Sequence, residues 1–177
     1  MGAALVIGGL SLFLWNQWDN YRAGEASDEI LAQPEGLMDA DSSSSDSGMT
    51  EVELDGNVYI GYITIPALGK TLPVMSEWSY EHLRIAPCRY FGSVETNDLV
   101  IAAHNYATHF GGLSNLVPGD KVYFTDLDGT TWSYEVVEVD TLSPTAVEEM
   151  TDSGYDLTLF TCTYGGQSRV TVRCDKA

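Results

Sequence analysis

Hydrophobic and polar positions divide the chain into three parts. Residues 3–15 form an uncharged apolar run, and Trp15, Trp18 and Tyr21 continue it at helical spacing. Residues 23–56 are acidic and serine-rich and contain no aromatic side chain. From residue 57 onward, short runs of β-branched and aromatic residues alternate with glycine, proline and Asp-Gly turns, which is typical of strands. The pattern predicts an apolar helix, a linker and one β domain.

The β domain at 57–177 is expected to consist of short strands. In the run 98–104, every residue between Asp98 and the histidine is apolar, which is typical of a strand buried on both faces. In all, strands are expected at 59–65, 71–75, 98–104, 119–126, 131–140, 156–162 and 169–174. Short helical segments are expected at 79–87 and 143–150, the second with Ser143 as its cap. Strands this short and frequent predict an all-β fold with short helices, a closed or nearly closed barrel.

Residues 1–22 are expected to form a membrane anchor and a juxtamembrane segment, because Trp15, Trp18 and Tyr21 are suited to a membrane interface. The apolar run is shorter than the ~20 residues that a span requires. No Lys or Arg precedes it, so we expect the sequence to begin inside a longer anchor. A helix packed on the domain and a cleaved signal peptide are the alternatives. Residues 23–56 cannot bury enough apolar surface to order themselves, and are expected to be a flexible linker.

Charge and cysteine content narrow the classes of function. The formal net charge of −18 argues against nucleic-acid binding, which requires a basic surface. Three cysteines, Cys88, Cys162 and Cys174, occur without a CxxC pair, so neither a disulfide framework nor a structural zinc site is indicated. Cys88 and Cys174 are the only pair for which a bridge is considered.

The last two predicted strands place a thiol opposite a cation. If residues 163–168 form the loop, Cys162 and Arg169 face each other across the hairpin, with Cβ atoms ~5 Å apart. The same face carries Arg173, whereas Leu157, Leu159, Val170, Val172 and Cys174 take the core side. Because a cationic neighbour favours the thiolate, Cys162 is a candidate nucleophile.

A histidine is the natural proton donor and acceptor for such a nucleophile. His104 ends the buried strand 98–104 and is expected at the mouth of the barrel, although a strand-end histidine with no catalytic role is the alternative. His82 is expected on the surface, and His109 lies in a polar turn.

From about residue 58 the chain resembles the sortase family of cysteine transpeptidases. The resemblance is carried by Thr158-Leu-Phe-Thr-Cys162, by VIAAHN around His104 and by Arg169, with weaker similarity in ITIPALGKTLPV and HFGGLSNLVPGDKVYF. It implies an eight-stranded sortase-type β-barrel, a Cys162–His104–Arg169 site, and an extracellular catalytic domain on a single-pass N-terminal anchor in the cell membrane of a Gram-positive-type cell. The subclass, class B-like or a related class, stays open.

Three further residues are considered as supporting groups. Thr161 precedes the nucleophile and has either a packing or hydrogen-bonding role or a catalytic one. Asn105 either orients the imidazole of His104 or is a turn residue. Arg173 lies four residues beyond Arg169, ~13 Å along a strand, which is too far to replace it.

The resemblance implies cleavage of an LPxTG-like sorting signal of secreted surface proteins. The acyl chain would pass through a thioester on Cys162 to an amine of a cell-wall precursor or a pilin. The alternatives are another cysteine-dependent acyl transferase or hydrolase of the cell envelope, and a non-catalytic surface protein. We expect no cofactor; calcium, which some family members bind, would have Glu148, Glu149, Asp152 and Asp156 as its candidate ligands.

Overall fold

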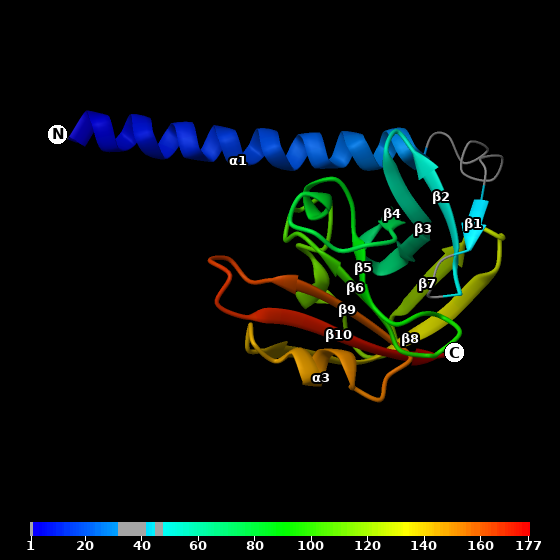
Figure 1. Ribbon diagram of the computed structural model, residues 1–177. Helices are drawn as coiled ribbons and strands as arrows, with labels where there is room; N and C mark the ends of the chain where they lie inside the picture. Colours follow the sequence, from blue (N-terminus) through cyan, green and yellow to red (C-terminus); the bar gives the residue numbers. More distant parts are fainter. Residues whose placement is uncertain (1, 32–41, 45–47) are drawn as a thin grey trace.

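The computed structural model describes residues 2–31, 42–44 and 48–177 (Figure 1). Its helices are α1 (Gly2–Leu31), α3 (Val147–Thr151) and the 3-10 turns η1 (Pro66–Leu68), η2 (His82–Arg84) and η3 (Leu113–Asn115). Its strands are β1 (Ser42–Ser44), β2 (Thr50–Leu54), β3 (Asn57–Ile65), β4 (Lys70–Met75), β5 (Cys88–Phe91), β6 (Leu99–Ala103), β7 (Lys121–Asp126), β8 (Thr131–Leu142), β9 (Leu157–Cys162) and β10 (Arg169–Lys176).

Eight of these strands close into a barrel. They follow the order β3-β4-β5-β6-β9-β10-β8-β7, and pairing of β7 with β3 completes the ring. Most neighbours are antiparallel, but β4 and β5 are parallel at one residue pair, and β6 and β9 are parallel over five. The predicted closed eight-stranded barrel is therefore confirmed, and β1 and β2 extend its sheet beyond β3.

Gly61 allows one edge of β3 to pair with two different strands, β2 and β7. The first part of β3 pairs with β2 and the second part with β7, and the register against β4 shifts between Tyr59 and Gly61. Gly61 has φ 145°, and a Cβ there would lie 2.2 Å from the carbonyl oxygen of Thr125 on β7. Only glycine permits this close approach of β3 to β7, so the residue contributes directly to barrel closure.

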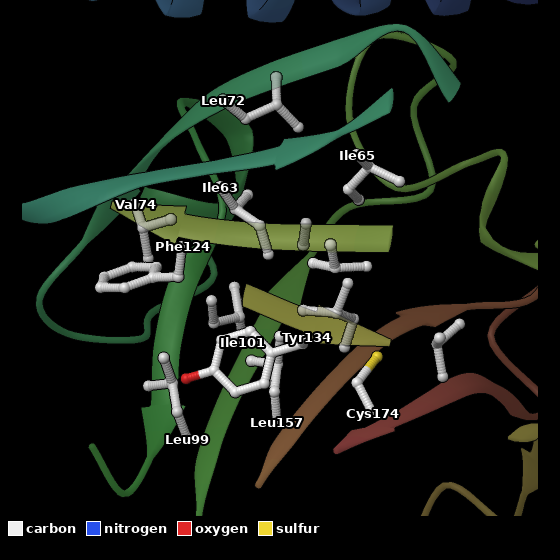
Figure 2. Packing of buried hydrophobic residues seen from close by; sticks show 14 of the residues in the cluster. Ile63, Ile65, Leu72, Val74, Leu99, Ile101, Phe124, Tyr134, Leu157 and Cys174 are labelled. Atoms are coloured by element: carbon white, nitrogen blue, oxygen red, sulfur yellow. The ribbon is translucent and has the colours of Figure 1, made fainter. Parts of the chain in front are cut away.

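The barrel interior is filled by aliphatic and aromatic side chains from nearly every strand (Figure 2). Figure 2 shows the rings of Phe124 and Tyr134 among Ile63, Ile101 and Leu157. The predicted inward side of the last hairpin is confirmed, since Leu157, Leu159, Val172 and Cys174 belong to this core and Val170 packs against it.

The outer face of the same strands is covered as well. Val100 and Ala102 of β6 and Phe160 of β9 form a second apolar cluster with Met150 of α3. Strand β6 is therefore buried on both faces, as its continuous apolar sequence predicts. The site described below lies where this outer cover ends.

Several local predictions need correction. The predicted helical segment 79–87 contains only η2, a single 3-10 turn. Helix α3 begins after Ala146, whose side chain cannot cap it; Ser143 lies three residues earlier, and its hydroxyl is hydrogen-bonded to the hydroxyl of Thr145. Three elements of the described residues fall wholly or partly in the range predicted as linker, 23–56: α1 continues to Leu31, and β1 pairs with β2, which in turn pairs with β3.

Helix α1 runs along one side of the barrel, and its first half projects beyond it (Figure 1). Apolar side chains from Leu5 to Trp18 are exposed, whereas Ala23 is buried. No helix within residues 2–31, 42–44 and 48–177 is long and apolar enough to cross a membrane. The predicted single-pass anchor at 1–22 is thus not supported.

Candidate active site

Cys162 and Arg169 form the closing pair of the β9–β10 hairpin. The loop 163–168 is fixed by hydrogen bonds from the Thr163 N–H to the Ser168 carbonyl (2.9 Å) and from the Gly166 N–H to the Thr163 carbonyl (2.8 Å). The predicted loop and register are confirmed. The thiol of a half-buried cysteine and a guanidinium therefore occupy opposed positions on one face of the hairpin.

Parallel pairing brings His104 beside this hairpin. The last pair between β6 and β9 is Ala103 with Thr161, so His104 and Cys162 follow on neighbouring strands at the same end of the barrel. Adjacent strands lie ~4.8 Å apart. The Thr161 hydroxyl donates a buried hydrogen bond to the Ala103 carbonyl (2.9 Å), which ties the two strands together immediately before the two residues.

The imidazole of His104 is stacked on the ring of Tyr106. The ring centroids are 3.8 Å apart and the planes are inclined by 11°. Burial lowers the pKa of His104 below its usual value, and this outweighs the neighbouring Asn105 amide and Asp19 carboxylate, which raise it. The environment thus favours the neutral imidazole.

A groove opens from Cys162 and Arg169 across the outer face of the barrel. Its wall is apolar and aromatic, and beside those two residues it is formed mainly by Trp78, Tyr80, Leu83, Tyr90, Ala102, Pro144, Val147, Met150 and Phe160. The aromatic rings contact one another in sequence: Tyr80 with Trp78, Trp78 with Tyr90, and Tyr90 with Phe160, at centroid distances of 5.2 to 5.7 Å. His104 is not among the lining residues; it directly follows Ala103, which lines the groove and pairs with Thr161 beside Cys162.

Arg169 is partly engaged with its own loop. Its Nη1 donates to the carbonyl oxygens of Gly166 (3.1 Å) and Ser168 (3.2 Å). Within the described part of the chain, these are its hydrogen bonds, and a guanidinium has five N–H donors in total. The remaining donors are available to a negatively charged oxygen beside Cys162.

Arg173 and the acidic residues near α3 are not part of the site formed by Cys162, Arg169 and His104. Arg173 is buried and donates to the Thr158 hydroxyl (3.0 Å) and the Glu149 carbonyl (2.6 Å), so the structure does not bring it to the groove. Asn105 lies in the loop directly after His104. The candidate calcium ligands do not come together: no group of three or more His, Cys, Asp or Glu side chains suited to a metal occurs among the described residues.

The other two cysteines differ sharply from Cys162. All three are free, so the considered bridge between Cys88 and Cys174 is not formed. Cys88 and Cys174 are completely buried, and burial raises the pKa of each to about 12. Cys162 is the one thiol with a groove in front of it.

Sequence reasoning missed Tyr106 and the aromatic wall. Tyr106 follows His104 by two residues, and Trp78 and Tyr80 stand in a polar stretch where aromatic side chains have no core to fill. That spacing is a usable signal, although the stack itself depends on the path of a loop. His109 was expected in a polar turn, but it is fully buried.

Comparison with known proteins agrees with this geometry. Residues 63–177 match the family model of the sortase domain. Sortase C from Streptococcus pneumoniae is 30% identical, with a TM-score of 0.60, over 67% of this chain and 68% of that one. Sortase A from Corynebacterium diphtheriae is 26% identical, with a TM-score of 0.61, over 71% of this chain and 62% of that one.

A sortase C from Clostridium perfringens matches over more of the chain. It covers 89% of this chain and 90% of its own, with a TM-score of 0.59 and 23% identity, so the likeness is one of fold. Among curated protein sequences, none matches. The family model covers well over half of the chain, and the barrel closes in the sortase manner; this protein therefore belongs to the sortase family of cysteine transpeptidases.

Proposed function

We propose that this protein cleaves a sorting signal of the LPxTG type and transfers the acyl part, through a thioester on Cys162, to an amine. The observation that carries the proposal is the pairing of Cys162 with Arg169 at the end of a groove, beside the strand end that bears His104. A nucleophile, a group that transfers protons and a donor for an oxyanion are what acyl transfer requires.

Bond formation starts at the sulfur. Neutral His104 takes the proton of the Cys162 thiol as the sulfur attacks the carbonyl carbon of the scissile bond; the S–C bond forms, and the carbonyl electron pair moves onto oxygen. Arg169 donates hydrogen bonds to that oxyanion; one such donor is typically worth ~3 kcal/mol of transition-state stabilisation. When the C–N bond breaks, protonated His104 gives its proton to the departing amine and the thioester remains.

The second half of the reaction reverses these roles. An incoming amine attacks the thioester carbon and neutral His104 takes its proton; the C–S bond breaks as the new amide forms, and His104 returns the proton to the Cys162 sulfur. These side chains supply the nucleophile, the proton transfer and the oxyanion donor, so the proposal requires no cofactor. A chelator such as EDTA should leave the rate unchanged.

The groove supports a peptide substrate with apolar residues before the scissile bond. Its aromatic and aliphatic wall leads away from Cys162, and only Arg169 contributes a charged side chain. Apolar walls with a few placed polar groups are typical of sites that select by shape and burial. A leucine and a proline, as in an LPxTG-like signal, match this wall.

The acceptor is proposed to be an amine of a cell-wall precursor or of a pilin. The sortase C of S. pneumoniae has pilin substrates, which supports the second choice by similarity. The proposal places the reaction at the cell surface, where sortases generally act, with the substrates among secreted surface proteins.

The experiment is hydroxylaminolysis of a sorting-signal peptide. The protein should convert an LPxTG-type peptide to its hydroxamate, and Cys162→Ala and His104→Gln should abolish the product. Peptide cleavage by water without any hydroxamate would instead indicate another cysteine hydrolase. A complete lack of cleavage with peptides of varied sequence would favour a non-catalytic surface protein.

A further inference from the structure

The end of α1 is docked on the loop that follows His104. Ala23 of α1 is buried, and a Cβ at Gly24 would lie 2.8 Å from the side chain of Thr108. Figure 1 shows this loop beneath the helix. Lys70 of β4 holds the same loop from the barrel side through a hydrogen bond to the Ala107 carbonyl.

Tyr106 connects this docked helix to the imidazole. Its hydroxyl donates a hydrogen bond to the Asp19 carboxylate of α1, and its ring stacks in parallel on His104 with centroids 3.8 Å apart. The ring of His109 lies 5.5 Å from Tyr106, tilted by 57°. Tyr106 is 7% exposed, so its ring is held from several sides.

His104 lacks the hydrogen bond that commonly orients a catalytic imidazole. Where a carboxylate accepts from the second ring nitrogen, it fixes both tautomer and orientation. The Nδ1 of His104 is buried and has no hydrogen-bond partner among the residues described. The Asn105 side chain interacts with the ring from the adjacent position in the chain, and the stacked ring of Tyr106 covers the face of the imidazole.

We propose that Tyr106, held by Asp19 of α1, is the positioning residue that fixes the imidazole plane of His104. The proposal rests on the proposed function, in which His104 transfers the proton. It makes α1 part of the support of the active site, because the helix contributes the acceptor that restrains Tyr106.

Charged and titratable groups approach this unit from three sides. Asp19 and Arg22 reach it from α1 and Arg84 from η2, and His109 lies in the same loop with Lys70 behind it. Asp19 raises the pKa of His104 and Arg84 lowers it, while burial is the largest influence and lowers it. Removing the Tyr106 ring exposes the imidazole to water and should move the pKa of His104 upward.

The test combines an NMR titration of the histidine ring protons with steady-state kinetics on the full chain. Tyr106→Leu removes the stacked ring, whereas Tyr106→Phe keeps it and removes the hydrogen bond to Asp19. Asp19→Asn weakens the same hydrogen bond from the other side. The matched control is Tyr21→Phe, which removes another tyrosine–carboxylate hydrogen bond of α1, to Glu25, away from the loop.

In Tyr106→Leu, we expect a higher pKa of His104 and a kcat lower by on the order of tenfold, with KM within about twofold. Tyr106→Phe and Asp19→Asn should each lower kcat about threefold, and the double variant should be no worse than either single one. Tyr21→Phe should match the parent protein. The His104 signal is assigned with His104→Gln.

An unchanged pKa of His104 together with unchanged or increased kcat in folded Tyr106→Leu would overturn the proposal. If Tyr106→Leu does not fold, Tyr106→Phe and Asp19→Asn decide it, and parent-like kcat in both overturns it. The NMR titration can be carried out on an inactive protein. It therefore tests the positioning role of Tyr106 separately from the proposed function. Full activity of His104→Gln refutes the proposed function, whereas an inactive His104→Gln with a His104 titration indifferent to Tyr106 refutes the positioning role alone.

Discussion

Cys162 and Arg169 are directly paired across the β9–β10 hairpin, and both line the groove. The pair is set by backbone register, since each strand of the hairpin contributes one residue at the point where the loop begins. In the proposed reaction, the guanidinium opposite the thiol faces the oxyanion that forms on the substrate.

Thiol reactivity should differ among the three cysteines. In the folded protein at neutral pH, iodoacetamide should label Cys162 and spare Cys88 and Cys174, because the latter two are fully buried and burial raises the pKa of each to about 12. Peptide mass spectrometry measures the labelling, and protein in urea, where all three react, is the control. Equal labelling of Cys174 in the folded protein would contradict the burial described here.

Arg169 and Arg173 should respond differently to the same substitution. Arg169→Lys should lower kcat by ~100-fold with little change in Tm, because a lysine cannot reproduce the planar donor set. Arg173→Lys should leave kcat nearly unchanged and lower Tm, since the guanidinium is buried against Thr158 and Glu149. Loss of activity in Arg173→Lys with normal Tm would reverse the assignment.

Thr161 should support the site through the strand pair. Thr161→Val keeps the shape but leaves the Ala103 carbonyl without its 2.9 Å hydrogen bond, which should reduce the free energy of unfolding by about 1–2 kcal/mol. Urea denaturation measures this change. We also expect a several-fold lower kcat, because His104 and Cys162 follow directly on the two strands. A valine variant as stable and as active as the parent would show that the hydrogen bond has no such role.

Burial of His109 should make stability depend on pH. Burial lowers the pKa of this imidazole to about 4, so between that value and the usual ~6.5 the unfolded chain binds a proton that the folded chain does not. Stability is therefore lost as the pH falls, by about 2 kcal/mol between pH 7 and pH 5 for this group. His109→Gln should show a smaller loss over that window in urea titrations, and His82→Gln is the control. An identical pH dependence in parent and His109→Gln would exclude this contribution.

Much of this site could be predicted from the sequence because it depends on strand periodicity. A six-residue loop and a period of two fix the opposition of Cys162 and Arg169 and the inward side of Leu157 and Leu159. An apolar strand followed by a histidine likewise predicts that His104 lies at the end of a buried strand. The hairpin depends on local pairing, whereas the position of His104 beside Cys162 also requires the parallel pairing of β6 with the distant strand β9.

What the sequence did not reveal depends on loops and on contacts between distant segments. The stack of Tyr106 on His104 requires the loop after β6 to fold back beneath α1. Its hydrogen-bond partner there, Asp19, is 87 residues from Tyr106 in the sequence. Helix α3 begins at Val147, four residues after the predicted cap Ser143, whose hydroxyl is hydrogen-bonded to Thr145 in the preceding turn. No pattern of hydrophobic and polar residues encodes these contacts.

Mass spectrometry of the intact protein during reaction with a panel of LPxTG-like peptides tests the whole account. We predict an added mass equal to the acyl part of the peptide, located on Cys162, removed by hydroxylamine and absent in Cys162→Ala. Turnover of the peptides without that adduct, or an adduct that persists in Cys162→Ala, would contradict the account.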